Sequence, residues 1–499
     1  MDLFEIDFDE KRHELSIRYS DDPLYNDDNF ADMMAQTDAV IKNEKENTQR
    51  RAEACVKKFQ LLEIRRKLAP KLLEKALELY PDMPQALTSM GRFYLHTQNM
   101  EKAIEYFNKV VDIDPSYPYV WLEKASIESD IEESIRFYSE FLKLKPDSII
   151  GYEKRSRLYE EIVLEEESLI NQVKLRDRLS AIQNAINNFS ELIRLDPSNW
   201  INYEGRAKMR LRMSKTIALL KGECNNLSSC NDGFIKDIEQ LMLLYPTDRV
   251  NNCITTIHNI FRDLPKGTAN EYITKIISDL PADSTAHFIA LILLADEYSY
   301  DEREKAIEIY SKIINSLEDG DLLQLHCFYH RAFWYSARKE FEKALADNAM
   351  IIKYGSLLPK MKRHYTSEPY FAREHRADIY EKMNDLTGAI NEYTLLLDWL
   401  NNTGERIHIT DAYFKRAGLF MKNGETDRAL ADYSAIIDLG SGGVERSLKK
   451  AYAASIKIYK TRGEMDKAFA TYIKMSELEK EEDDLFMLDC IETEFEIEE

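Results

Sequence analysis

The chain has 499 residues and a formal net charge of −22, and hydrophobic residues make up 44% of it. Its 16 glycines and 13 prolines are too few for a mostly β or linker-rich chain. No run approaches the roughly 18 apolar residues that a membrane span needs, and the start lacks the basic and then apolar pattern of a secretory leader. We therefore expect a cytoplasmic protein whose six scattered cysteines stay reduced.

Residues 1–48 are expected to form an acidic N-terminal segment. Residues 1–50 hold 14 acidic and 6 basic side chains, a net charge of −8. At the start, Phe4, Ile6 and Phe8 alternate with polar residues. This alternation fits either a short hairpin that covers another surface or an acidic tail without fixed structure. The remainder, residues 20–48, is expected to be a polar connector with at most one short helix.

The stretch Leu87–Tyr94, followed by Ala103, Phe107 and Pro115, sets a spacing that recurs along the chain. A mostly small residue with a larger one four positions later is found again at nine places: Ser134/Tyr138, Ala185/Phe189, Phe234/Ile238, Ala269/Ile273, Ala306/Tyr310, Ala344/Asn348, Ala389/Tyr393, Ala429/Tyr433 and Ala468/Tyr472. This spacing predicts units of two antiparallel helices that pack closely through their small residues. Proline cannot continue a helix, so Pro115 and its counterparts are expected to end second helices: Pro146, Pro197, Pro246 and Pro281.

This order of residues resembles the tetratricopeptide repeat family, whose units are helix pairs of about 34 residues. The resemblance implies an all-α, right-handed superhelical solenoid of antiparallel helix pairs, with about ten units over residues 49–475. Successive pattern positions lie between 31 and 51 residues apart, and the two longest intervals carry inserts near residues 163–180 and 215–233. The first insert is expected to lengthen helices, and the second is expected to be a loop.

Members of this family usually bind ligands along the concave surface that the first helix of each unit lines. The resemblance implies that the groove here contains Thr88 and Arg92, Leu122 and Ser126, Glu153 and Arg157, Glu204 and Lys208, Tyr329 and Phe333, Glu374 and Asp378, and Phe414 with Gly418. Among these, we select Arg92, Arg157, Lys208, Tyr329, Phe333 and Phe414 as candidate partner-binding residues. The alternative for the three aromatic residues is an ordinary position in the core.

No arrangement of residues predicts catalysis. The sequence has no Gly-x-Ser-x-Gly, kinase or dinucleotide-binding pattern, and Gly440–Gly443 lacks the lysine of a phosphate loop. His326 and His330 lie four apart on a predicted helix, next to Cys327, so two imidazoles share a face that zinc could use. Because no third ligand stands at a recognisable spacing, we expect no metal site, no cofactor and no catalytic residue.

The charge is concentrated at the ends of the chain. Residues 476–499 form an acidic C-terminal tail with 12 acids and one lysine, which leaves the repeat body at about −3. Two basic clusters stand out in the body, Arg206–Lys215 and Lys360–His364. They are either exposed helix faces without a function or a docking site for an acidic segment, such as this tail. A body so close to neutral disfavours nucleic acid as a partner.

We therefore expect a scaffold or adaptor without catalytic activity, which binds a partner protein or an extended peptide in its groove. The alternative is a sensory receptor for a short signalling peptide. Such receptors generally carry an effector module, for example a DNA-binding helix-turn-helix, and the sequence shows no pattern of this kind.

Overall fold

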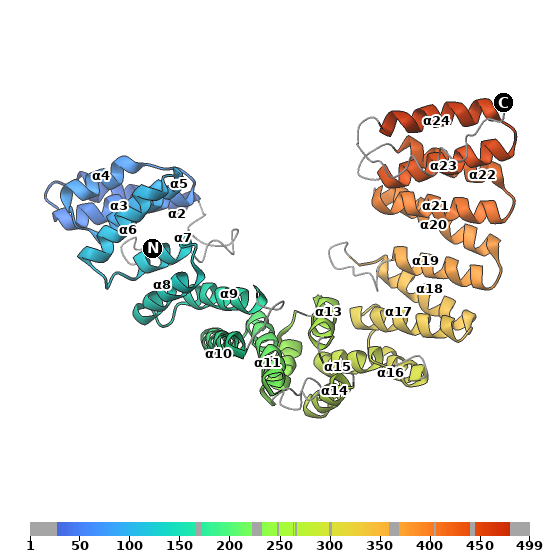
Figure 1. Ribbon diagram of the computed structural model, residues 1–499, viewed down its shortest axis with the longest axis horizontal. Helices are drawn as coiled ribbons and strands as arrows, with labels where there is room; N and C mark the ends of the chain where they lie inside the picture. The colour runs from blue at the N-terminus through green and yellow to red at the C-terminus, as the bar shows by residue number, and fades with distance from the viewer. Residues whose placement is uncertain are drawn as a thin grey trace. The chain divides into compact units, whose positions relative to one another are not determined.

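The computed structural model describes residues 27–165, 172–221, 232–246, 249–262, 264, 267–298, 302–358, 369–403, 406–439 and 445–479. Within these ranges the chain forms 23 helices and no strand (Figure 1). The all-α solenoid expected from the sequence is thereby confirmed. The N-terminal hairpin, most of the acidic tail and the basic cluster at 360–364 fall outside the described residues. No helix in the described part is long and apolar enough to cross a membrane.

The chain divides into two compact units, one up to Leu244 and one from Tyr245. The helices of the first unit are α2 (Asp27–Lys42), α3 (Thr48–Ile64), α4 (Pro70–Leu79), α5 (Pro84–His96), α6 (Met100–Ile113), α7 (Pro118–Ile127), α8 (Ile131–Leu144), α9 (Ile149–Glu165), α10 (Gln172–Leu195), α11 (Trp200–Lys221) and α12 (Asp232–Leu244). The helices of the second are α13 (Val250–Phe261), α14 (Thr268–Asp279), α15 (Thr285–Asp296), α16 (Arg303–Ser316), α17 (Leu322–Ala337), α18 (Phe341–Gly355), α19 (Pro369–Lys382), α20 (Leu386–Thr403), α21 (Arg406–Lys422), α22 (Thr426–Asp438), α23 (Glu445–Thr461) and α24 (Met465–Glu479).

The recurring spacing falls on the second helix of each pair. Its ten positions lie one on each even-numbered helix from α6 to α24, and all ten leading residues are buried, as are their partners apart from Tyr472. The first helix approaches closely enough that a Cβ added to Gly91 would stand 2.4 Å from the ring of Phe107. The same distance separates a Cβ at Gly205 from the ring of Phe189. Small residues are therefore required where paired helices touch.

The prolines end second helices as the sequence predicts. The helices α6, α8, α10, α12 and α14 each stop two residues before one of the prolines at 115, 146, 197, 246 and 281. The residue before a proline is pushed out of the helical region by the pyrrolidine ring, so the helix must end there. This fixes the point at which the chain turns back to begin the next pair.

A partly buried arginine connects neighbouring pairs at five levels in the described part of the array. Arg416 on α21 shows the pattern: its Nε and Nη2 donate to the Asp432 carboxylate on α22 at 2.9 and 2.6 Å, and its Nη1 donates to the Thr394 hydroxyl on α20 at 3.1 Å. The side chain thus ties a first helix both to its own second helix and to the second helix of the preceding pair. We call this arrangement the arginine clasp.

The same clasp is built by the other four arginines. Each lies on a first helix and bonds to the preceding and the following second helix, with these partners: Arg155 to Ser139 and Asn188, Arg206 to Ser190 and Asp237, Arg331 to Ser311 and Asp347, and Arg376 to the Leu345 carbonyl and Glu392. In every case the next residue in sequence is small and buried: Ser156, Ala207, Ala332, Ala377 and Ala417. The clasp and the tight helix crossing therefore sit side by side.

Two segments differ from a uniform array. The first long insert lengthens helices as expected, since α10 has 24 residues where α8 has 14. The polar connector expected at residues 20–48 instead contains α2, a helix of 16 residues that packs on α3. Its apolar residues suit that packing, because Met33 and Ile41 are buried. Of the second insert, residues 215–221 extend α11, and 222–231 lie outside the described part.

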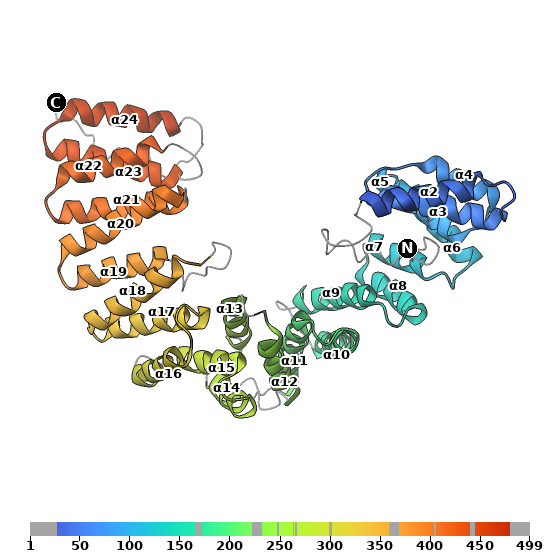
Figure 2. The same cartoon turned by 180° about the vertical axis from the view of Figure 1, so that it is seen from behind.

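Helix α13 departs from the pairing of its neighbours. It packs against α15 and α17 rather than against α14, and it lies beside one end of α17 in both views (Figures 1 and 2). Its buried face is aliphatic, with Ile254, Ile257 and Ile260, so it can fill a gap between first helices without the aromatic signature of the repeat. This displacement brings residues of α13 next to side chains far along the sequence.

We predict that Ala429→Leu destabilises the protein, because Ala429 is fully buried where α22 packs on its neighbours. Overpacking such a crossing costs about 1–3 kcal/mol of unfolding free energy. Ala431→Leu adds the same side chain to an exposed site on the same helix and should change stability by less than about 0.5 kcal/mol. Denaturant unfolding of the two variants checks this, and equal effects would contradict the assigned packing.

Candidate functional site

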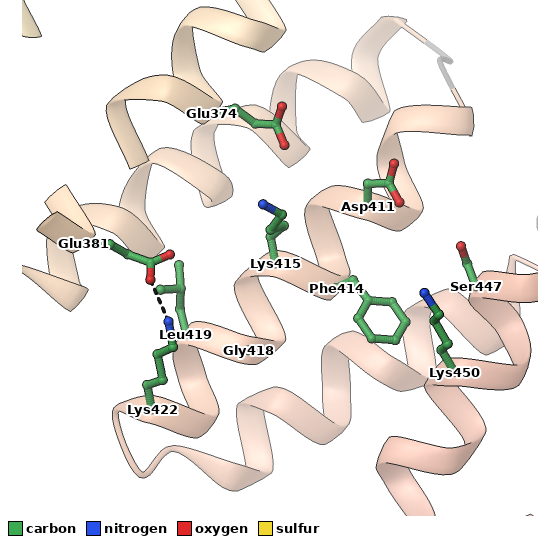
Figure 3. A pocket seen from close by; sticks show the side chains of 10 residues that line it. All are labelled: Glu374, Glu381, Asp411, Phe414, Lys415, Gly418, Leu419, Lys422, Ser447 and Lys450. Atoms are coloured by element: carbon green, nitrogen blue, oxygen red, sulfur yellow. Dashed lines mark hydrogen bonds and ion pairs between the residues drawn. The ribbon is translucent and has the colours of Figure 1, made fainter. Parts of the chain in front are cut away.

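A groove of about 500 Å³ crosses α19, α21 and α23, the first helices of three successive pairs (Figure 3). We call it the C-terminal groove. Its lining consists of Glu374 and Glu381 from α19, Asp411, Phe414, Lys415, Gly418, Leu419 and Lys422 from α21, and Ser447 and Lys450 from α23. The family register had singled out Glu374 from one unit and Phe414 and Gly418 from the next, and the fold brings these three together around one space.

The charges of the C-terminal groove are balanced in number but not all paired. Lys422 forms an ion pair with Glu381 at 2.7 Å, drawn as a dashed line in Figure 3. Burial raises the pKa of Glu374, and the nearby carboxylate of Asp378 raises it further, while Lys415 opposes the shift. Within the described part of the chain, neither Lys415 nor Lys450 forms an ion pair. The groove therefore presents two cations to an incoming group, alongside the carboxylates of Glu374 and Asp411.

The centre of the C-terminal groove combines an aromatic surface with free space. Phe414 is half-buried and meets the ring of Tyr433 edge-on, with ring centroids 5.4 Å apart. Beside it, a Cβ built on Gly418 would have no atom within 4 Å. The glycine, which lies one turn along α21 from Phe414, thus leaves open space in the lining that an apolar side chain of a ligand can enter.

A smaller groove of about 230 Å³ lies along α9, α10 and α11 in the first unit. It contains the predicted residues Arg157 and Lys208 with their register neighbours Glu153 and Glu204. Lys208 is already paired with Glu204, and burial raises the pKa of Glu153, an effect that Arg157 opposes. This groove is smaller than the C-terminal groove and, like it, contains one ion pair.

The remaining candidate residues have different positions. Arg92 is 2% exposed and lies between Glu63 and Glu123, with nitrogen–oxygen distances of 3.7 Å to each. The surface position inferred for Arg92 is therefore wrong, since its guanidinium faces buried carboxylates rather than solvent. Tyr329 is half-buried against His330, whereas Phe333 is 56% exposed, which excludes the core alternative for Phe333.

The basic cluster Arg206–Lys215 does not form a free cationic patch. Arg206 and Arg210 both bond to Asp237, which is 1% exposed, at 2.7 and 2.5 Å. One carboxylate offsets only one of these two charges, but both guanidinium groups are held inside the protein, and Lys208 is paired with Glu204. Only part of this cluster is therefore available as a docking site for the acidic tail. The sequence could not show it because Asp237 lies beyond the second insert.

The histidine pair on α17 has companions that sequence spacing did not show. Asp296, the last residue of α15, places its carboxylate beside His326 and His330, and His258 of α13 bonds to the same carboxylate at 2.9 Å. Burial alone would raise the pKa of Asp296, but the histidines around it hold that pKa well below its ordinary range. A third side chain of a metal-ligand type, which the sequence spacing did not show, thus lies beside the pair, 30 residues before His326 in the chain.

We predict that the burial of His375 in its neutral form makes the protein less stable to unfolding as the pH falls. His375 lies on α19 next to the groove residue Glu374, and its Nδ1 accepts a hydrogen bond from the Asn348 amide at 3.2 Å. Burial, helped by Lys382, lowers the pKa of His375 to about 4. In the unfolded chain the imidazole has a pKa of about 6.5. Below that pH the unfolded state binds a proton that the folded state does not bind. The free energy of unfolding therefore falls as the pH is lowered, until the pKa of the folded protein is reached.

The measurement compares the melting temperatures of the wild type and His375→Gln at a series of pH values between pH 7 and pH 4, about half a pH unit apart. Glutamine can still accept the hydrogen bond but does not titrate. The variant should lose less stability than the wild type over this window. Parallel curves for the two proteins would show that His375 is not held neutral.

Comparison with known proteins gives one family match. A profile of the tetratricopeptide repeat matches residues 67–127, a region that contains α4 to α7. Among solved structures, the human IFIT1 dimer with m7Gppp-AAAA is similar at 12% identity and a TM-score of 0.27, over 91% of this chain and 95% of that chain. The structure of Naa15/Naa10 bound to HypK-THB is similar at 13% identity and a TM-score of 0.26, over 93% and 67%. At these scores neither likeness bears on function. A search of curated proteins finds no match.

Proposed function

We propose that this chain, which carries tetratricopeptide repeats, is a non-catalytic scaffold that holds a segment of a partner protein in the C-terminal groove. The observation that carries the proposal is that three successive first helices line one groove. The lining contains the half-buried Phe414 and, one turn further along α21, open space at Gly418. Proteins of this architecture use such surfaces to bind extended peptides or helices through side-chain contacts.

The lining supports a partner segment with a specific chemistry. An apolar or aromatic side chain would enter the gap at Gly418 and pack on Phe414, because buried aromatic contacts supply much of the energy of such interfaces. A carboxylate on the same segment would face Lys450 and Lys415, since neither lysine has an ion-pair partner in the described part of the chain. Hence the proposed ligand is an acidic segment with an apolar anchor.

Other observations favour this function over its alternatives. Two of the three arginines in the cluster Arg206–Lys215 are bonded to the buried Asp237, which reduces the cationic surface available to nucleic acid. A sensory receptor for a short peptide would use the same groove, so the size of the bound molecule separates the two. The cytoplasmic setting remains part of the proposal, and the buried free thiols of Cys55, Cys253 and Cys327 suit it. The acidic segments at 1–48 and 476–499 are proposed as solubilising flanks.

The test fills the gap in the groove. Gly418→Leu places a bulky side chain beside Phe414, and an interior helical glycine is destabilising by up to about 1 kcal/mol, so the variant should fold at least as well as the wild type. We expect its affinity for the partner to fall about tenfold or more, which is the effect of losing one buried apolar contact. Partners would be isolated on full-length wild-type protein from its native host, identified by mass spectrometry and titrated against each variant.

The matched control is Ala431→Leu, which adds the same side chain on an exposed face of α22 outside the groove. Phe414→Ala should weaken binding like Gly418→Leu, whereas Phe469→Ala, an exposed phenylalanine on α24, should not. A partner protein retained by the wild type and lost by the groove variants supports the scaffold. Recovery of a peptide of a few residues supports the receptor, and a partner bound equally by all variants contradicts the groove assignment.

A further inference from the structure

Four titratable side chains from three helices meet in the second unit. Asp296 ends α15, His258 lies on α13, and His326 and His330 lie one turn apart on α17. The carboxylate oxygens of Asp296 stand 2.9 Å from His258 Nε2, 4.0 Å from His326 Nε2 and 3.7 Å from His330 Nδ1. We call these four residues the histidine cluster. His258 belongs to it because α13 leaves its pairing and packs on α15 and α17.

The cluster contains a buried imidazole with unused nitrogens. The side chain of His326 is 3% exposed, and neither of its ring nitrogens has a hydrogen-bond partner among the described residues. Its Nε2 points toward Asp296 at a distance too long for a hydrogen bond. Buried polar atoms without a partner cost stability, so such an atom in a native protein calls for an occupant. A metal ion is an occupant that can use the lone pair of a neutral imidazole.

The distances fit a metal after a small adjustment. The candidate ligand atoms of Asp296, His326 and His330 all lie within 4.8 Å of one another. In a tetrahedral zinc site with bonds of about 2.0–2.1 Å, the ligand atoms stand roughly 3.4 Å apart. Rotation of the two imidazoles about their side-chain torsions can supply the difference, because both lie on the same face of one helix.

We propose that Asp296, His326 and His330 bind a divalent transition metal of the zinc class, with His258 orienting the Asp296 carboxylate through its hydrogen bond. Two imidazole nitrogens and one carboxylate oxygen suit zinc and related ions, whereas calcium and magnesium require oxygen ligands. Hydrogen bonds to a ligating carboxylate fix its orientation, which is the part played by His258 and by the hydroxyl of Tyr310. Cys327 is not a ligand, since it follows His326 by one residue and therefore projects about 100° away around the helix.

Three protein ligands leave one coordination position for another group. The cluster opens on a cavity of about 230 Å³ that is also lined by Phe333 and Trp334. Because Phe333 is exposed, the fourth position is reachable by water or by a side chain of a partner. The metal would also connect the end of α15 to the middle of α17, so its binding should stabilise the second unit against unfolding.

The experiment titrates zinc into the full-length, chelator-treated protein in competition with a chromophoric zinc chelator. We expect one tight zinc site per chain that depends on the cluster. Asp296→Asn, His326→Gln and His330→Gln should each weaken it by more than about 100-fold, and His258→Gln by about 10- to 100-fold, the usual effect of losing an orienting hydrogen bond. The control His287→Gln, on α15 but outside the cluster, should bind zinc like the wild type.

A second readout separates loss of the site from loss of the fold. Circular dichroism identifies any variant that fails to fold, and the remaining variants then carry the test. Zinc should raise the melting temperature of the wild type and of His287→Gln, but not that of the folded cluster variants. Absence of stoichiometric zinc binding to the wild type would overturn the proposal. So would zinc affinity that is unchanged in all four cluster variants, because the ion would then be held by cysteines or acidic segments elsewhere.

Discussion

The arginine clasp is the interaction on which the rest of the array depends. The planar guanidinium has donors in a fixed fork, so it bonds to a carboxylate through two nitrogens while a third donates to a different helix. Arg331 and Arg416 do this in the same way: each grips an aspartate sixteen residues later and a hydroxyl on the preceding second helix. Burial raises the pKa of Asp347, whereas the hydrogen bonds and the positive charge of Arg331 oppose this shift and stabilise the carboxylate form. Such a pair need not add net stability, but losing one partner costs about 3–5 kcal/mol.

The clasp also determines which residues face a ligand. Successive residues of a helix point about 100° apart, so three neighbours can serve three purposes. On α21, Lys415 faces the C-terminal groove, Arg416 forms the clasp, and Ala417 is buried where helices cross. On α17 the corresponding residues are His330, which lines a cavity, Arg331 and Ala332. The C-terminal groove and the histidine cluster are thus formed by the exposed faces of first helices. The other faces of these helices are fixed by the arginine clasp and by close helix crossings.

Much of the fold follows from local pattern. Small residues four positions before a larger one, and prolines after them, located the second helices because close packing and helix termination are short-range requirements. The clasp was also present in the sequence, as an arginine before a small residue and an acid sixteen positions later at Arg331, Arg376 and Arg416. The site was less predictable. Asp296 meets His326 through the packing of α15 on α17, and His258 joins them only through the displacement of α13. The burial of Arg92 depends on Glu63 and Glu123 from two other helices.

The most direct test of the clasp is hydrogen exchange along the full-length chain carrying Arg416→Met. Removing the guanidinium leaves the buried carboxylate of Asp432 without its partner, while the methionine retains most of the apolar volume. Because repeats couple mainly to their neighbours, faster exchange should be confined to α20–α23 and leave the first unit unchanged. Exchange that is unaltered in these helices, or that rises uniformly along the chain, would contradict the view that the clasp arginines hold successive helix pairs together.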